Sequence, residues 1–190
     1  MQSWDTANKA SELSDFSVCT SWGVKGKDLY LLHVLRRRME YPELKRAVCE
    51  QCAAFAANVI LIEDKASGTQ LIQELIEQGL HAVTRYQPQS DKIMRMHAQT
   101  AMIENGFVHL PKEAGWFAEY LHELTVFPKG KHDDQVDSTA QMLGWFKRGG
   151  QEPQDWMWQQ YKEAQARGPQ PARPEPLSVM AKRLGILRSL

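Results

Sequence analysis

Acidic residues recur in this chain at the junctions between predicted strands and helices. Asp5 stands in SWDTA at the end of a predicted first strand, and Glu63 directly follows the apolar run VILI. Asp133, Asp134 and Asp137 stand together in HDDQVDS, where a helical pattern begins. Taken singly, these residues predict a turn, a solvated strand end and a helix cap. Because the carboxyl ends of strands in an open α/β sheet meet at one edge, together they predict one shared acidic site.

The spacing of these acids favours a metal site. Asp134 and Asp137 are three residues apart and Asp133 and Asp137 are four apart, so each pair shares a helix face. Two carboxylates about 4 Å apart repel by roughly 4 kcal/mol at an effective dielectric of about 20, so an ionised cluster requires a cation. Carboxylate oxygens prefer hard ions such as Mg²⁺ or Mn²⁺. Two such ions about 3.5–4 Å apart can activate water and stabilise the leaving oxygen in phosphodiester cleavage.

Basic residues in predicted helices and loops, and at one predicted strand end, are candidate contacts for a DNA backbone. They are Lys65, Lys92, Arg95, Lys129 and Lys131, together with Arg37 in the run RRR at a predicted strand end. Lys and Arg side chains that touch phosphates add salt-dependent affinity without reading the base sequence. The alternative for Lys65, Lys92 and Arg95 is a solvated helix position, and the alternative for Arg37 is a basic strand edge that resists aggregation.

The elements that would position these residues alternate between strand and helix patterns. After the first strand, the patterns predict strands over residues 16–24, 29–35, 59–62, 81–86 and 107–110. They predict helices over residues 42–57, 67–78, 91–104, 115–125 and 133–146. Gly26 predicts a hairpin turn, and the continuous apolar run before Glu63 indicates a central strand buried on both faces. We therefore expect an α/β fold in which helices flank a mixed sheet of about five strands.

Composition narrows the class of protein. The chain has 190 residues, of which 43% are hydrophobic, and its 23 Lys plus Arg balance 23 Asp plus Glu. Zero net charge disfavours a general nucleic-acid coat protein, which would be strongly basic. A nuclease can still be neutral, because its acidic metal site offsets a basic DNA track elsewhere. Cys49 and Cys52 form a C-x-x-C without the second pair of ligands that a zinc site needs, so we expect core packing. The sequence has no apolar run long enough for a membrane span and no signal-peptide core, which predicts an intracellular protein.

The pattern changes after residue 149, so we expect a folded domain over residues 1–149 and a tail over residues 150–190. Residues 168–176 read GPQPARPEP, with four prolines, which is typical of an extended linker. Residues 177–190, LSVMAKRLGILRSL, form a short basic amphipathic segment. This segment predicts either a frayed terminal helix or a docking peptide for a partner.

Several segments in order resemble the nuclease domain at the C-terminal end of phage large terminase subunits. They include SWDTANKASELSDFSV, LIEDKASGTQLI, DKIMRMHAQTAMIENGFVHLP and KHDDQVDSTAQML, and the resemblance covers about residues 4–146. It implies an RNase H-like fold, with Asp5 as the metal ligand of the first strand and Glu63 as the ligand of the central strand. Asp134 would be the third ligand with Asp133 as the close contender, and Asp137 would be an occasional or indirect one.

The resemblance implies an endonuclease that cuts double-stranded DNA concatemers with two Mg²⁺ or Mn²⁺ ions, in the cytoplasm of the host. The sequence lacks a G-x-x-x-x-G-K-[ST] phosphate loop, so we expect no packaging ATPase and interpret the chain as an excised domain. A resolvase that selects branched DNA is an alternative with the same site. A second alternative is a non-catalytic module whose tail binds a portal or small terminase subunit. A Rossmann-like nucleotide binder is disfavoured, because no glycine-rich loop follows a strand.

Overall fold

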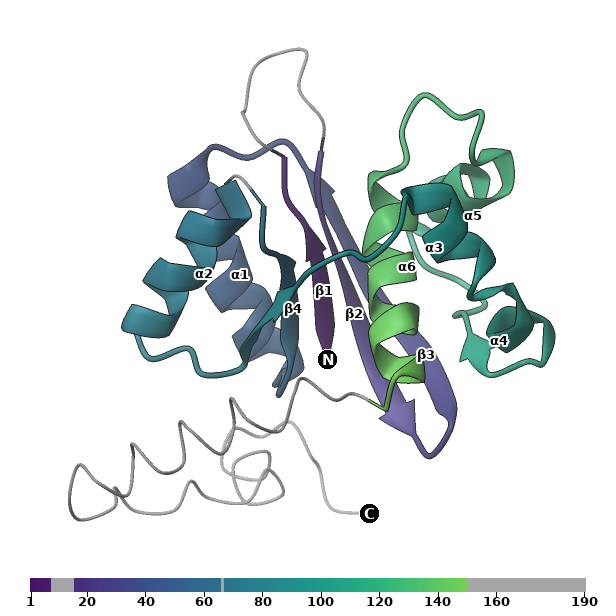
Figure 1. Ribbon diagram of the computed structural model, residues 1–190, viewed down its shortest axis with the longest axis horizontal. Helices are drawn as coiled ribbons and strands as arrows, with labels where there is room; N and C mark the ends of the chain where they lie inside the picture. The colour runs from purple at the N-terminus through teal and green to yellow at the C-terminus, as the bar shows by residue number, and fades with distance from the viewer. Residues whose placement is uncertain (8–15, 66, 150–190) are drawn as a thin grey trace. The chain divides into compact units, whose positions relative to one another are not determined.

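The computed structural model describes residues 1–7, 16–65 and 67–149, and in them six strands form one mixed sheet (Figure 1). The strands are β1 (Gln2–Asp5), β2 (Ser17–Lys25), β3 (Asp28–Arg37), β4 (Ile60–Glu63), β5 (Val83–Tyr86) and β6 (Val108–His109), in the spatial order β5-β4-β1-β2-β3-β6. Strands β1, β2 and β3 form an antiparallel meander, whereas β4 and β5 run parallel to β1 and β6 runs parallel to β3. The mixed sheet predicted from the sequence is confirmed.

Helices cover both faces of this sheet (Figure 1). On one face lie α1 (Tyr41–Phe55) and α2 (Ser67–Glu77). On the other lie α3 (Lys92–His97), α4 (Thr100–Glu104), α5 (Phe117–Val126) and α6 (Asp134–Lys147). The predicted tail, residues 150–190, lies outside the described residues.

Two hydrophobic cores follow from the alternation of side chains along the central strands. Trp4 of β1 and Ile62 of β4 are fully buried in the core beneath α1 and α2. Leu61 of β4 is fully buried in the opposite core, together with Leu143 of α6. The VILI run is therefore apolar throughout because β4 contributes to both cores, as the sequence predicted.

The prediction of one continuous helix over residues 91–104 is wrong, because this segment forms two short helices, α3 and α4. The break falls at Ala98 and Gln99. Gln99 is buried, and its side-chain amide approaches Gly144 of α6, where an added Cβ would lie 3.4 Å from Gln99 Nε2. Packing of Gln99 against α6 therefore overrides a helical pattern that the local sequence alone would continue.

The prediction that both cysteines of the C-x-x-C pack in the core is wrong for Cys49, which is exposed. Helix α1 buries Leu44, Ala47 and Val48, and the next positions on that face are 51, 52 and 55. Cys52 is accordingly partly buried against the core, whereas Cys49 lies off the buried face.

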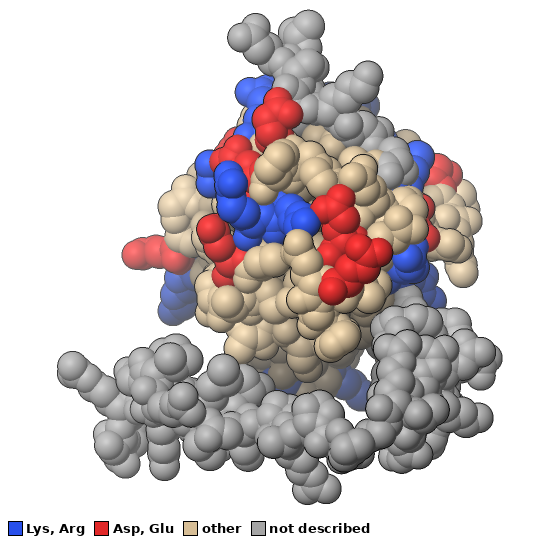
Figure 2. Space-filling view, turned by 90° about the vertical axis from the view of Figure 1, so that its left-hand side faces the viewer, with Lys and Arg blue, Asp and Glu red and all other residues tan. Residues whose placement is uncertain are grey.

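Figure 2 shows the face that carries α1 and α2, where Lys and Arg side chains alternate with Asp and Glu. Lys45 of α1 and Glu74 of α2 form an ion pair between these helices at 2.7 Å. Neither sign of charge dominates among the described residues of this face. No helix among the described residues is long and apolar enough to cross a membrane.

Candidate active site

Two of the predicted ligands, Asp5 and Glu63, are the last residues of neighbouring parallel strands. The residues before them, Trp4 and Ile62, are paired in register and lie in the core beneath α1 and α2. Because side chains alternate between the faces of a strand, Asp5 and Glu63 both project to the opposite face, which α6 covers. Strand pairing alone thus brings two carboxylates from distant parts of the sequence side by side.

Helix α6 is fixed to the sheet by buried hydroxyl groups. Ser3 Oγ donates to the Ser138 carbonyl at 2.7 Å, and Ser138 Oγ donates to the Ser3 carbonyl at 2.8 Å. The hydroxyls of Ser138 and Thr20 are also 2.8 Å apart. Asp134 lies one helical turn before Ser138, and Asp5 lies two strand residues beyond Ser3, in the same direction. This pinning therefore places the first turn of α6 next to the strand ends.

A pocket of about 890 Å³ opens where these elements meet. All five predicted carboxylates line it: Asp5, Glu63, Asp133, Asp134 and Asp137. Four of the predicted cations line it as well: Lys65, Lys92, Arg95 and Lys131. The structure thus brings nine sequence-predicted residues to one pocket, while their chemical roles remain predictions.

The backbone at Glu63 is held by close packing of the α2 N-terminus. Gly68 is buried and its amide donates to the Lys65 carbonyl at 3.0 Å, while the Lys65 amide donates to the Glu63 carbonyl at 2.9 Å. A Cβ added at Gly68 would lie 2.1 Å from the Glu63 carbonyl oxygen. Glycine is required at this position because only hydrogen fits between the helix and the strand end.

The electrostatics of the pocket favour cation binding. Burial raises the pKa of Asp5 well above its usual value, and the charges of Asp137, Asp134, Glu63 and Asp133 raise it further, in that order. Burial also raises the pKa of Asp137, although the Arg95 guanidinium opposes that effect. A divalent cation would relieve the repulsion that raises the Asp5 pKa.

Two cations of α3 form ion pairs with the acidic residues of α6. Lys92 pairs with Asp133, and Arg95 Nη2 contacts Asp137 Oδ1 at 2.8 Å. The hydrogen bond to Asp133 is the main reason that the pKa of Lys92 is raised, while partial burial opposes it. Lys92 and Arg95 were predicted as DNA contacts. In the structure both line the pocket, and each forms an ion pair with a carboxylate of α6.

The donor set fits a hard divalent cation. The five carboxylates offer only oxygen ligands, which suit Mg²⁺ or Mn²⁺ better than softer ions. Within residues 1–7, 16–65 and 67–149, no three side chains of Asp, Glu, His or Cys are already arranged as a metal site. Asp133 and Asp137 point into ion pairs with α3, so ligation requires carboxylates to turn toward a common point.

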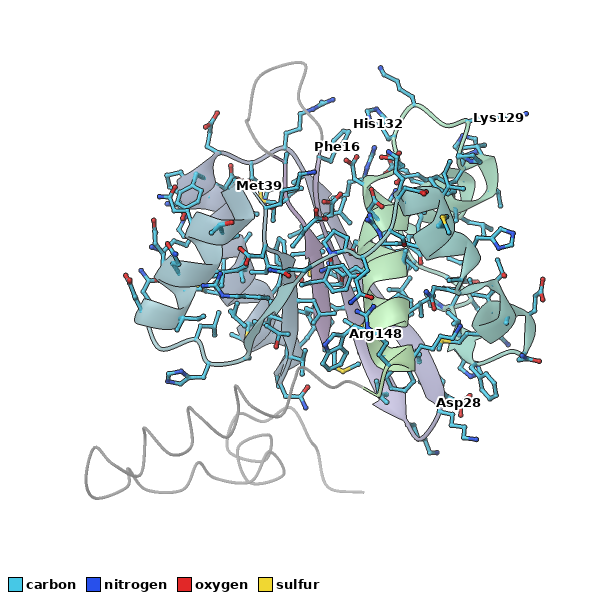
Figure 3. All side chains as sticks on the ribbon, viewed as in Figure 1. Phe16, Asp28, Met39, Lys129, His132 and Arg148 are labelled. Carbon is cyan, nitrogen blue, oxygen red and sulfur yellow. The ribbon has the colours of Figure 1, made fainter. Side chains whose placement is uncertain are left out.

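The two remaining predicted cations do not line the acidic pocket. Arg37 is exposed and pairs with Glu43 at 2.7 Å. Lys129 lines a neighbouring pocket of about 480 Å³, which shares Lys131 and Phe16 with the acidic one. Figure 3 shows Phe16, His132 and Lys129 at one end of the sheet and Asp28 at the other.

Sequence reasoning missed Phe16 and Glu123. Phe16 lines both pockets, with the Arg36 guanidinium 3.7 Å and the Arg38 guanidinium 4.2 Å from its ring centroid. Glu123 of α5 is buried and hydrogen-bonded to Gln135 of α6. A charged residue within the amphipathic pattern of residues 115–125 is the one sequence signal that could have identified Glu123.

Solved structures with the same fold include large terminase proteins of two thermophilic bacteriophages. The large terminase nuclease of thermophilic phage G20c with bound magnesium matches with a TM-score of 0.58 and 17% identity, over 75% of this chain and 79% of that one. The large terminase of a second thermophilic bacteriophage matches with a TM-score of 0.56 and 10% identity, over 75% of this chain and 39% of that one. These matches show that the chain shares the fold of these proteins, and together with the family match below they confirm the RNase H-like fold predicted from the sequence.

Comparison of the sequence with known families agrees with the fold. No curated protein sequence matches the chain significantly. The model of the terminase RNaseH-like domain matches residues 2–144, a span that contains both strand ends and the first three turns of α6. With the acidic residues in the predicted order and the sheet that brings them together, this match shows that the chain belongs to the terminase RNaseH-like domain family.

Proposed function

We propose that this chain is a metal-dependent endonuclease that cuts double-stranded DNA during phage genome packaging. Membership of the terminase RNaseH-like domain family supports a nuclease role in phage DNA packaging. The observation that carries the proposal is the convergence of carboxylates from β1, β4 and α6 on one pocket with cations at its rim. Magnesium in the related G20c nuclease structure supports a divalent cofactor.

Asp5, Glu63 and Asp134 are the proposed metal ligands. Asp134 is favoured over Asp133 as the third ligand because it lies in the first turn of α6, is only 6% exposed, and raises the pKa of Asp5 more strongly than Asp133 does. Asp133 pairs with Lys92 at the rim, which suits a second or exchangeable ligand. Asp137 lies one turn further along α6 and pairs with Arg95, so it would help to orient the metal ligands without being a main ligand itself. Bound ions would activate a water molecule and stabilise the leaving oxygen of the phosphodiester.

The cations around the pocket are the proposed DNA contacts. Lys65 lies two residues after the β4 carboxylate Glu63, and Lys131 precedes those of α6, so the two flank the acidic centre from opposite elements. Lys129 extends the basic rim into the neighbouring pocket. Such side chains hold the phosphate backbone in register without reading bases, so the isolated domain should show little sequence preference and strong salt dependence.

Cleavage of supercoiled plasmid tests the proposal. The purified chain should nick and linearise plasmid with Mg²⁺ or Mn²⁺ and remain inactive with EDTA. Glu63→Gln should abolish cleavage, whereas the matched control Asp64→Asn should retain it, because Asp64 pairs with Arg85 outside the pocket. Cleavage that persists in EDTA or in Glu63→Gln would contradict the proposal. A four-way junction tested in parallel would reveal a resolvase if it were cut much faster than linear duplex.

A further inference from the structure

Helix α6 begins at the active site with an unusual cap. Asp133 occupies the N-cap position, where an aspartate ordinarily accepts a hydrogen bond from the second or third amide of the helix. Here the Asp133 side chain makes no such bond and pairs with Lys92 instead. The residue best suited to cap this helix is thus turned away from it, toward the pocket.

The missing cap is supplied from a different helix. Glu123 of α5 accepts a hydrogen bond from the backbone amide of Gln135, the second residue of α6, through Oε1 at 2.7 Å. Its Oε2 accepts from the Gln135 side-chain amide at 2.6 Å. A carboxylate at the positive end of a helix is stabilised by the aligned backbone dipoles as well as by the hydrogen bond.

Glu123 is a built feature of the fold and not a surface acid. It is only 5% exposed, and Arg36 Nε of β3 lies 3.7 Å from its Oε2. One turn earlier on α5, the hydroxyl of buried Tyr120 lies 3.0 Å from that of Thr139 on α6. Helix α5 therefore contacts the first two turns of α6 at two points, and the Glu123 contact is the one at the start of the helix.

We propose that Glu123 is a positioning residue: it caps α6 in place of Asp133 and so leaves the Asp133 carboxylate available to the metal ions. The inference rests on the proposed metal site. Without Glu123, the Gln135 amide would lose its acceptor, and Asp133 can replace it because an N-cap aspartate ordinarily accepts from this amide or the next. Asp133 would then turn back onto its own helix and be withdrawn from the pocket.

A double-mutant cycle with Mn²⁺ as the probe tests this exchange. Mn²⁺ affinity by titration calorimetry and Tm without metal are measured for wild type, Asp133→Ala, Glu123→Ala and the double variant. Glu123→Gln retains an oxygen that can accept from Gln135 and should behave close to wild type. Glu119→Gln is the matched control, since Glu119 lies one turn earlier on α5, pairs with Arg36 and is 61% exposed.

Asp133→Ala should change a different quantity in each background: the Mn²⁺ affinity in wild type, and the Tm in Glu123→Ala. In wild type, Asp133→Ala should weaken Mn²⁺ binding by roughly ten- to hundredfold and change the Tm little. In the Glu123→Ala background, which already binds Mn²⁺ more weakly, it should weaken binding no further but lower the Tm by about 2–4 °C, because Asp133 is then the cap.

Equal effects of Asp133→Ala in both backgrounds, or a folded Glu123→Ala variant that binds Mn²⁺ as wild type does, would overturn the inference and leave the proposed function standing. A wild-type chain that binds no Mn²⁺ would overturn both.

Discussion

Replacing Gly68 by alanine is expected to damage the site through the backbone that carries Glu63. The added Cβ would lie 2.1 Å from the Glu63 carbonyl oxygen, whereas ordinary contact begins at 3.4 Å, so helix and strand end must separate by about 1.3 Å (3.4 minus 2.1). Overpacking of this kind costs about 1–3 kcal/mol of unfolding free energy. A displacement of about 1 Å in a catalytic group can lower the rate by roughly 10²-fold.

Plasmid cleavage rates in Mg²⁺ and thermal unfolding of the metal-free protein measure the two effects of Gly68→Ala. Gly115→Ala is the matched control, because a Cβ at Gly115 meets no atom within 4 Å. Gly68→Ala should cleave at about 1% of the wild-type rate and unfold several degrees lower, while Gly115→Ala changes neither. A Gly68→Ala variant with the wild-type rate and Tm would refute the argument that close packing at Gly68 positions Glu63.

Three further predictions concern charge, metal and packing. Because the pKa of Asp5 in the folded protein lies well above its ordinary value of 3.8, the metal-free protein loses stability as pH rises through the window between the two. Asp5→Asn should therefore have a higher urea midpoint of unfolding than wild type in EDTA at pH 7. This difference in midpoint should vanish below about pH 3.8, which urea unfolding at a series of pH values measures. Mn²⁺ at about 100 times its Kd should stabilise wild type by about 2.7 kcal/mol, and Asp134→Asn should largely abolish that shift in a thermal scan. Ser138→Ala removes hydrogen bonds to Ser3 and Thr20 and should cost about 1–3 kcal/mol in urea unfolding; an unchanged midpoint would show that these bonds do not hold α6.

The sequence predicted the central part of the fold because its patterns are local. A short uninterrupted apolar run followed by a polar boundary favours a strand buried on both faces, and β4 is such a strand. Gly26 adopts positive φ at the hairpin turn between β2 and β3, where the sequence predicted a turn. The convergence of the acidic residues on one pocket could be predicted for the same reason, since each stands next to a recognisable element boundary.

Features that depend on distant packing were not predictable from local patterns. Gln99 interrupts a helical pattern because it inserts toward Gly144, a residue 45 positions away in the sequence (144 minus 99). The cap that Glu123 provides for α6 likewise joins two helices, and its sequence signature is a single charged residue. Lys92 and Arg95 were predicted as cations facing DNA, yet their pairing with α6 carboxylates depends on how α3 packs against the site.

The central claim is that carboxylates from β1, β4 and α6 hold the ions that cleave DNA. Anomalous scattering from crystals of the chain grown with Mn²⁺ tests it most directly. We expect two peaks about 3.5–4 Å apart in the pocket, within ligating distance of Asp5, Glu63 and Asp134. Well-ordered Mn²⁺ peaks elsewhere on the domain, with none among these three carboxylates at saturating metal, would contradict the account.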